Sequence, residues 1–296
     1  MYNKSVTILV NSCDLYEDAW EPFFKLLKIH WPECEQFDIV LNTESKHYDC
    51  DFLNVRVYRG GQSVPWSKRL KSCLKTIDSE FIVFFLEDFF IKSRVNTLVF
   101  EESLSLLKNE KGIGVVSLIP GLNIKNPYWK TQGQYNKYFT EIVDSPARIN
   151  AVSAIWRKDY LIRLLKDNEN PWEFEKNATI RAKVYRKKVY CPVFDMQSPV
   201  FDFGVKIENG YGISSKKWLP KNKELFEKYG IDVNYDNLGW YEADDKPSAP
   251  VSKRKKRTKK EILKLIYKNP FELLNMINVK LKQTLKKIIY YIKVFF

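Results

Sequence analysis

The feature that most constrains the fold is a run of six consecutive apolar residues, Phe81 to Leu86 (FIVFFL), which stops at two acids, Glu87 and Asp88. A short apolar run bounded by polar residues is typical of a strand that is buried on both of its faces. Such strands occur in sheets that carry helices on both sides. The run therefore predicts a central strand in a helix-covered sheet, with two carboxylates at its end.

Short apolar runs alternate with helical patterns along the chain. Strands are predicted at 7–10, 37–41, 55–58, 81–86 and 114–118, with a strand-like stretch at 150–156. Helices are predicted at 18–31, 67–77, 95–108 and 159–165, and another opens at Asn170-Pro171-Trp172. This alternation predicts an α/β fold. The stretch from 120 to 150 lacks periodicity and is predicted to be a long irregular binding loop.

Composition bounds the cellular setting. The chain has 296 residues, 45% of them apolar, enough for one domain of about 200 to 250 residues and a smaller appendage. No apolar run approaches the ~18 residues that cross a bilayer, and the N-terminal apolar stretch is too short for a signal peptide. The five cysteines are scattered and odd in number, which favours reduced thiols. We therefore expect a cytoplasmic protein.

The positive charge is concentrated at the C-terminus. Of the net charge of +13, residues 251–296 hold +12, and residues 1–250 hold only +1. We expect a catalytic domain at 1–245, a basic linker at 246–260 and a helical tail at 261–296. A nucleic-acid-binding domain is not expected, because the body of the chain is electrically balanced.

The tail has the pattern of a basic amphipathic helix. From Leu274 onward, apolar residues recur at steps of three and four, and most lysines fall off that stripe. Such helices lie on anionic membrane surfaces. We expect residues 253–296 to hold the protein on the inner face of the cytoplasmic membrane; the alternative is a helix that docks on the body or on a partner protein.

Glu87 and Asp88 are candidate metal ligands. In open α/β sheets, ligands bind beyond the carboxyl ends of the strands. Adjacent carboxylates in a region of low dielectric repel each other unless a cation neutralises them, and Mg²⁺ or Mn²⁺ binds carboxylates together with phosphate oxygens. The alternative is a strand-end turn with solvated acids. A literal D-x-D at Asp49-Cys50-Asp51 follows no apolar strand, so we prefer Glu87-Asp88.

Several sequence blocks, in a fixed order over residues 4 to 240, resemble glycosyltransferases of the GT-A type, in particular bacterial enzymes that build lipopolysaccharide and capsular polysaccharide. The blocks are NSCD, DAWEPFFKLLKIHWPE, FDIVLNTE, PWSKRLKSCLKTIDSEFIVFFLEDFF, NAVSAIWRKDYLIRLL, NPWEFE and ENGYGISSKKW. The resemblance implies a GT-A-like fold with a mixed, mainly parallel sheet flanked by helices. It also implies that Glu87-Asp88 is a D-x-D-type motif that holds Mn²⁺ or Mg²⁺ on a nucleotide-sugar diphosphate, although glutamate comes first here and phenylalanine stands at position 89.

Polar residues near the predicted strand ends are candidates for donor binding. The resemblance implies that the end of the first strand holds the nucleotide base, through Asn11 and Asp14 with Asn42 and Thr43 nearby. Arg69, on the helix predicted before the strand 81–86, is a candidate for binding a diphosphate oxygen in the bidentate geometry that arginine favours. The alternative for the four residues near the strand ends is that they cap loops. The alternative for Arg69 is that it is a solvated arginine on a helix.

The WEFE element supplies two candidate bases for deprotonating an acceptor hydroxyl. Glu173 and Glu175 are two residues apart, so on a helix they point in different directions. By resemblance to a W-x-x-E region in related enzymes, Glu175 is the first choice and Glu173 the second. The alternative is that both complement the helix dipole. Four aromatic residues are candidates for a sugar platform, namely Tyr128, Trp129, Tyr135 and Tyr138.

The sequence therefore predicts a metal-dependent glycosyltransferase that moves a sugar from a nucleotide-sugar donor, expected to be UDP-linked, to a hydroxyl of a glycan or lipid-linked glycan in surface polysaccharide synthesis. A sugar nucleotidyltransferase is the alternative enzyme, but NSCDLYED lacks the glycine-rich phosphate loop it needs. A nucleic-acid-binding protein that uses the basic tail is the non-enzymatic alternative.

Overall fold

The computed structural model describes residues 4–119, 131–143, 145, 148–193, 200–204 and 212–242. The chain divides into two compact units, one of Met1–Ala182 with Lys187–Ser248 and one of Lys183–Arg186 with Ala249–Phe296. All described residues except those of Lys183–Arg186 belong to the first unit. The predicted linker and tail at 246–296 lie outside the described residues.

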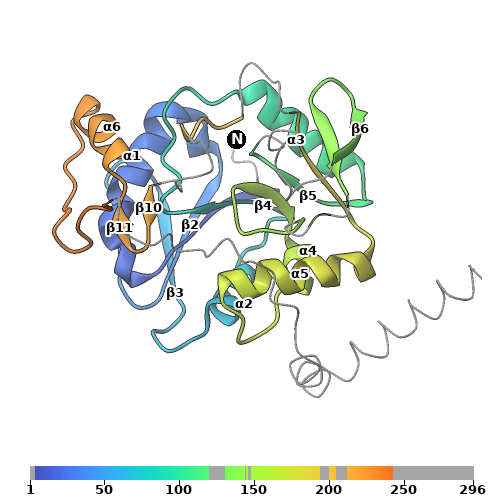
Figure 1. Cartoon of the computed structure of the whole chain (residues 1–296), viewed down its shortest axis with the longest axis horizontal. Coiled ribbons are helices and arrows are strands. Elements are labelled where there is room, and N and C mark those ends of the chain that lie inside the picture. Colours follow the sequence, from blue (N-terminus) through green and yellow to red (C-terminus); the bar gives the residue numbers. More distant parts are fainter. Residues whose placement is uncertain are drawn as a thin grey trace, which may run out of the picture. The chain divides into compact units, whose positions relative to one another are not determined.

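The first unit is built on a nine-stranded sheet in the order β3-β2-β1-β4-β8-β5-β9-β7-β6 (Figure 1). Strands β1 to β4 are mutually parallel, whereas β8 and β7 run against their neighbours. The predicted α/β fold with a mixed, mainly parallel sheet is confirmed. The strands are β1 (Val6–Asn11), β2 (Asp38–Thr43), β3 (Val55–Arg59), β4 (Phe81–Leu86), β5 (Ile113–Ser117), β6 (Thr131–Tyr135), β7 (Phe139–Ile142), β8 (Ala154–Arg157) and β9 (Lys188–Pro192).

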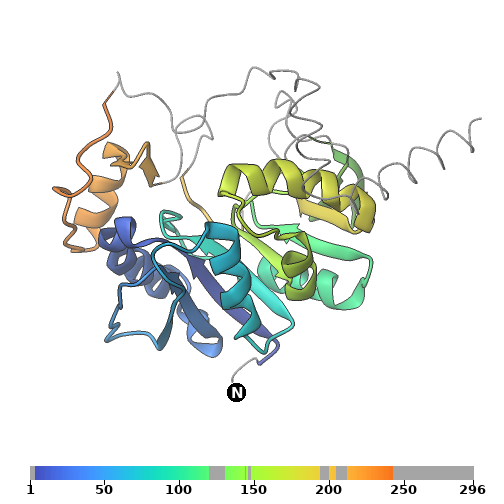
Figure 2. The same ribbon diagram turned by 90° about the horizontal axis from the view of Figure 1, so that it is seen from below.

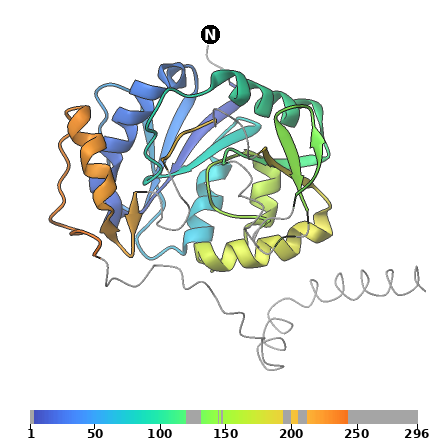
Figure 3. The same cartoon turned by 45° about the horizontal axis from the view of Figure 1, so that its top comes forward.

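Helices cover both faces of this sheet. They are α1 (Trp20–His30), α2 (Trp66–Lys75), α3 (Thr97–Asn109), α4 (Lys158–Leu164), α5 (Pro171–Tyr185) and α6 (Lys223–Lys228). Figure 3 shows the dark blue α1 and the teal α3 along one side of the sheet, and the cyan α2 and yellow-green α5 along the other. Figure 2 views the layer of α2, α4 and α5. None of the described helices combines the length and apolar character needed to cross a bilayer.

The alternation of side chains along the strands explains the two layers. Phe81, Val83 and Phe85 of β4 belong to one apolar cluster with residues of α1 and α3. Ile82 and Phe84 are equally buried but lie outside that cluster, because successive side chains of a strand point to opposite faces. The strand is apolar throughout because both faces are covered, as the six-residue run predicts.

Several elements differ from the sequence-based expectation. The helix expected from Asp18 begins as a 3₁₀ turn, Asp14–Ala19, and becomes α-helical only at Trp20. The stretch expected to be irregular contains the antiparallel pair β6–β7. Its first strand reads TQGQY, which lacks the apolar alternation that identifies a half-buried strand. The antiparallel strands β10 (Ile213–Ser214) and β11 (Lys217–Trp218) were not predicted either, because two residues are too few to show an alternation of apolar side chains.

Candidate functional site

The carboxyl ends of β1, β2 and β4 meet at one edge of the sheet. Asn11, the last residue of β1, is in register with Asn42 of β2 on one side and with Leu86 of β4 on the other. The chain therefore leaves β1 toward β2 and β3, and later returns to the opposite side of β1 as β4. Such a reversal of strand order opens a crevice beyond the strand ends, where ligands of α/β proteins bind.

Glu87 and Asp88 follow β4 directly at this edge. Glu87 is buried, with 6% of its surface exposed. Burial raises its pKa to about 8, and the charge of Asp88 adds to that shift. Burial also raises the pKa of Asp88, although Oδ2 of Asp88 lies 3.3 Å from the backbone N–H groups of both Gly212 and Ile213, which donate to it. Two ionised carboxylates are costly here, and a cation would offset that cost.

Arg69 projects from the first turns of α2 and is only 2% exposed. Its Nε and Nη1 atoms have no hydrogen-bond partner among the described residues. Its positive charge acts to lower the pKa of Glu87, which places the two side chains in one neighbourhood. Buried guanidinium N–H groups without acceptors are costly, and phosphate oxygens are the acceptors that arginine binds best.

Gly60 makes room for this arginine. A Cβ atom at position 60 would lie 2.4 Å from Cγ and 2.9 Å from Cδ of Arg69, closer than carbon atoms can approach. Gly60 follows β3 at the same edge of the sheet, where the sequence shows a strand ending in Arg59-Gly60-Gly61. The pair Gly60-Gly61 after the strand is the sequence signal from which this close approach of Arg69 could have been predicted.

The carboxylates fit a metal that is shared with a diphosphate. Across the described ranges, no group of three or more His, Cys, Asp or Glu side chains gathers in a way that could hold an ion alone. Mg²⁺ and related ions are commonly held by one or two carboxylates and completed by substrate phosphates and water. Glu87 and Asp88 can supply the protein ligands, and the unpaired N–H groups of Arg69 can meet the phosphate oxygens.

Asn11, Asn42 and Thr43 lie together at the ends of β1 and β2, and all three are buried. Nδ2 of Asn42 donates to Oδ1 of Asn11 over 2.6 Å, and the Thr43 hydroxyl donates to the carbonyl of Lys46 over 2.8 Å. The three side chains thus tie the strand ends and the following loop together. Their contact with a nucleotide base stays a prediction.

Asp14 lies at the same edge, and its carboxylate is hydrogen-bonded to the loop after β2. Oδ1 accepts hydrogen bonds from the N–H groups of Glu44, Ser45 and Lys46, and Oδ2 accepts one from the Ser45 hydroxyl at 2.5 Å. Burial opposes ionisation of Asp14, but the hydrogen bonds from Ser45 and its neighbours hold the pKa below its usual value. The carboxylate therefore caps this loop, and its contact with a nucleotide base stays a prediction.

The two glutamates of the WEFE element differ in what they contact. Glu173 is exposed and closes a capping box at the start of α5: its N–H donates to Oδ1 of Asn170 over 2.9 Å, and its Oε2 accepts from the N–H of Asn170 over 3.1 Å. Glu175 accepts from the N–H of Ala151 over 2.9 Å, and burial raises its pKa. Only Glu175 points back toward the sheet.

The contact with Ala151 places Glu175 at the carboxyl edge of the sheet. β8 runs antiparallel to β4, and its first residue, Ala154, pairs with Phe84. Residues just before Ala154 therefore extend past the end of β4, toward Glu87. The structure thus brings Glu175 to the edge that carries the two acids and Arg69, while Glu173 faces solvent.

Two further residues at this edge, Tyr16 and Lys221, were not predicted from the sequence as part of the site. Burial and the charge of Glu87 raise the pKa of the Tyr16 hydroxyl, so this hydroxyl lies within electrostatic range of the acidic pair. Lys221 lies near Asp88: burial and the charge of Lys92 lower the pKa of Lys221, and Asp88 acts against them. Neither residue belongs to a motif, and Lys221 is far from Asp88 in sequence, so no local signal could have identified it.

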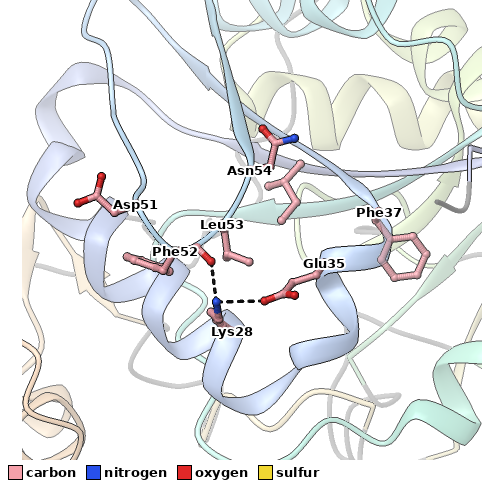
Figure 4. Close-up of a pocket in the computed structure, with 8 residues that line it drawn as sticks. Lys28, Glu35, Phe37, Asp51, Phe52, Leu53 and Asn54 are labelled. Carbon is pink, nitrogen blue, oxygen red and sulfur yellow. Dashed lines mark hydrogen bonds and ion pairs between the residues drawn. The ribbon is translucent and has the colours of Figure 1, made fainter. Parts of the chain in front are cut away.

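The literal D-x-D lies elsewhere. Asp51 lines a surface pocket with Lys28, Glu35, Phe37 and Asn54, and Lys28 bonds to the carbonyl of Phe52 and to Glu35 (Figure 4). Phe37 and Asn54 immediately precede β2 and β3, so this pocket is at the amino ends of the strands, opposite the edge that holds Glu87.

The candidate aromatic platform is only partly described. Tyr128 and Trp129 lie outside the described residues. Tyr135 is exposed and contacts Tyr190 edge to face, and Tyr138 contacts Phe139 in the same manner. These two belong to the β6–β7 hairpin at the far edge of the sheet, several strands from β4. A role for them in sugar binding stays a prediction.

Comparison with known proteins gives distant structural similarities only. No protein-family model matches the sequence, and no curated protein matches it. Among solved structures, S. aureus TarS 1-349 in complex with UDP-GlcNAc aligns at 15% identity with a TM-score of 0.45, over 66% of this chain and 57% of that chain. A mannosyltransferase from Pyrobaculum calidifontis, PcManGT, in complex with GDP-Man and Mn²⁺ aligns at 12% identity with a TM-score of 0.44, over 64% and 55%.

A UDP-glucose pyrophosphorylase complexed with UDP-glucose also aligns, at 11% identity with a TM-score of 0.44, over 65% of this chain and 90% of that chain. The aligned part of this chain covers less than two thirds of the length of the TarS and PcManGT chains. Similarities at this level assign neither a family nor a function.

Proposed function

We propose that this chain is a GT-A-like glycosyltransferase that moves a sugar from a nucleotide-sugar donor to the hydroxyl of a glycan or lipid-linked glycan acceptor. One observation carries the proposal: two adjacent carboxylates, the buried Glu87 and the half-buried Asp88, meet the buried Arg69 at the carboxyl edge of the sheet, and two N–H-bearing nitrogens of Arg69 have no hydrogen-bond partner among the described residues. A diphosphate with a divalent cation is the ligand that satisfies all three groups.

Donor binding is assigned to Glu87, Asp88 and Arg69. The two carboxylates would hold Mn²⁺ or Mg²⁺, and the guanidinium of Arg69 would donate hydrogen bonds to a diphosphate oxygen. When bound, the cation neutralises charge that develops on the leaving nucleotide diphosphate. Arg69 would stabilise the same developing charge, because its N–H groups are buried and held in place before the ligand binds.

Acceptor activation is assigned to Glu175. For a transfer that inverts the anomeric centre, a carboxylate must accept the proton of the attacking hydroxyl. The raised pKa of Glu175 brings its basicity closer to neutral pH, which suits this task. The N–H of Ala151 holds one carboxylate oxygen, and the other is left for the acceptor.

The setting of the reaction is part of the proposal. A UDP-linked donor, a role in lipopolysaccharide or capsule synthesis, and attachment of residues 253–296 to the inner leaflet would together place the active site beside a lipid-linked acceptor. Flotation of the full chain with anionic liposomes tests the attachment. A chain truncated after residue 245 should stay unbound, and equal flotation of both forms would contradict it.

Calorimetric titration of the full chain with UDP and with GDP, each with and without Mn²⁺, tests the donor site. We expect metal-dependent binding of one nucleotide, its loss in Glu87→Gln and its weakening, short of loss, in Arg69→Met. Binding should be retained in Asp51→Asn, because Asp51 lines the pocket at the amino ends of the strands. A folded protein that binds neither nucleotide would refute the assignment. Release of pyrophosphate from a nucleoside triphosphate and a sugar phosphate would instead favour the nucleotidyltransferase.

A further inference from the structure

Glu169 is a buried acid that the proposed reaction does not use. It precedes the capping residue of α5 and is 9% exposed. Its carboxylate binds both terminal nitrogens of Arg181, with Nη1 2.9 Å from Oε1 and Nη2 2.7 Å from Oε2. Asn177 donates a further hydrogen bond to Oε1 over 2.8 Å. Glu169 is thus locked onto one face of α5.

The backbone of Glu169 bonds to a different helix. Its N–H donates to the hydroxyl of Ser67 over 2.9 Å, and its carbonyl accepts from the N–H of Ser67 over 3.2 Å. Ser67 is the second residue of α2, where backbone N–H groups have no partner within the helix. The carbonyl of Glu169 supplies one. The rings of Trp66 and Phe174, 5.5 Å apart, join the same two helices.

This junction lies next to the site. Arg69 comes two residues after Ser67, in the same turn of α2, and Glu175 comes six residues after Glu169, in the second turn of α5. A buried, bidentate ion pair contributes little net stability, but it holds its partners in one geometry. The candidate phosphate-binding arginine and the candidate base therefore share one buried support.

We propose that Glu169 is a positioning residue, which holds the first turn of α2 against the start of α5 and thereby fixes where the guanidinium of Arg69 lies. The expected effect on donor binding rests on the proposed function. The placement of the Arg69 guanidinium by Glu169 does not, because it follows from the contacts of Glu169 with Ser67 and Arg181.

Two readouts on the full chain test this inference. In Glu169→Gln, which keeps the shape but loses the charge, we expect the ¹⁵N resonance of Arg69 Nε to shift without any ligand. We also expect the dissociation constant of the nucleotide, with Mn²⁺, to rise at least tenfold. In an Arg69→Met background, Glu169→Gln should cause no further loss, because the group it positions is absent.

Matched variants separate positioning from general damage. Glu80→Gln removes a carboxylate that pairs with the buried Arg157 over 2.6 Å at the amino end of β4, and it should change neither readout. Ser67→Ala keeps the ion pair but removes the hydroxyl that accepts from Glu169, and it should shift the Arg69 signal even if Glu169→Gln does not fold.

Three results would overturn the inference: an unchanged Arg69 resonance in the folded variants, additive losses in the Arg69→Met background, or equal effects from Glu80→Gln. If the wild-type chain binds neither UDP nor GDP, the proposed function fails. The Arg69 resonance then still decides whether Glu169 positions that side chain.

Discussion

Asp14 and Glu44 exchange hydrogen bonds between the loops that follow β1 and β2. The N–H of Asp14 donates to Oε2 of Glu44 over 3.1 Å, and the N–H of Glu44 donates to Oδ1 of Asp14 over 3.1 Å. The paired register of β1 and β2 ends at Asn11 and Asn42, so this reciprocal pair continues the link between the two chain segments beyond the sheet. It ties together the two loops that follow these strands, at the edge of the sheet that carries the proposed donor site.

Replacing Asp14 with Asn should lower the free energy of unfolding by about 1–3 kcal/mol, because charge-assisted hydrogen bonds to backbone N–H groups are weakened. The pKa of Asp14 is lowered in the folded protein, so its contribution is present above pH ~4 and is lost as pH falls through the folded-state pKa. Urea unfolding from pH 7 to pH 3 should therefore show wild type and variant converging in acid. Asp51→Asn, at an exposed position, is the control, and parallel curves for Asp14→Asn would contradict the prediction.

His30 should make the protein less stable in mild acid. The residue ends α1, is buried, and has an Nε2 atom without a hydrogen-bond partner among the described residues. Burial lowers its pKa, the charge of Lys228 lowers it further, and Asp202 opposes both. The unfolded chain therefore takes up the proton first, and stability falls as pH drops below ~6.5, by at most about 1.4 kcal/mol per pH unit.

The chain has two histidines, which gives this test a matched control. His30→Phe keeps a ring against Tyr229, whose centroid lies 5.1 Å from that of His30, and should flatten the dependence of unfolding free energy on pH between 5 and 7. His47→Gln should leave it unchanged. A slope that survives in His30→Phe would assign the effect to another group.

Gly60→Ala should weaken nucleotide binding more than it weakens the fold. The new Cβ atom would displace the aliphatic stem of Arg69, so the guanidinium would no longer meet the diphosphate. We expect at least a tenfold rise in the dissociation constant, equivalent to about 1.4 kcal/mol, measured by calorimetry with Mn²⁺. Gly112→Ala is the control, since a Cβ atom there meets nothing within 4 Å. Unchanged affinity in Gly60→Ala would argue against Arg69 as a phosphate ligand.

Glu173 and Glu175 should separate stability from chemistry. Glu173→Ala breaks the capping box and should cost about 1 kcal/mol of unfolding free energy, with turnover preserved. Glu175→Gln should reduce sugar transfer by about 10²- to 10⁴-fold, because it removes a general base. Transfer of labelled sugar from the nucleotide-sugar to a membrane acceptor fraction measures the second effect. A large loss of transfer in Glu173→Ala would reverse the assignment.

Local patterns in the sequence were enough to predict much of the framework. The strand Phe81–Leu86 is predicted with its observed bounds, because a strand covered on both faces must be apolar at every position. The start of α5 is predicted as well, since its capping residues lie within a few positions of one another. The β6–β7 hairpin was missed because its polar strand shows no alternation of apolar residues.

The sequence alone determined which residue types stand near the strand ends: amides at the ends of β1 and β2, an arginine in the helix before β4, and two acids after β4. The tertiary structure decided which of them face one another. The Asp14 carboxylate bonds to a loop about thirty positions away, and Glu169 bonds to Ser67 across 102 positions. Arg69 keeps N–H groups without a partner among the described residues, within electrostatic range of Glu87. Burial, pKa and unmet hydrogen-bonding capacity depend on neighbours that are distant in sequence, so these properties arise only when the chain is folded.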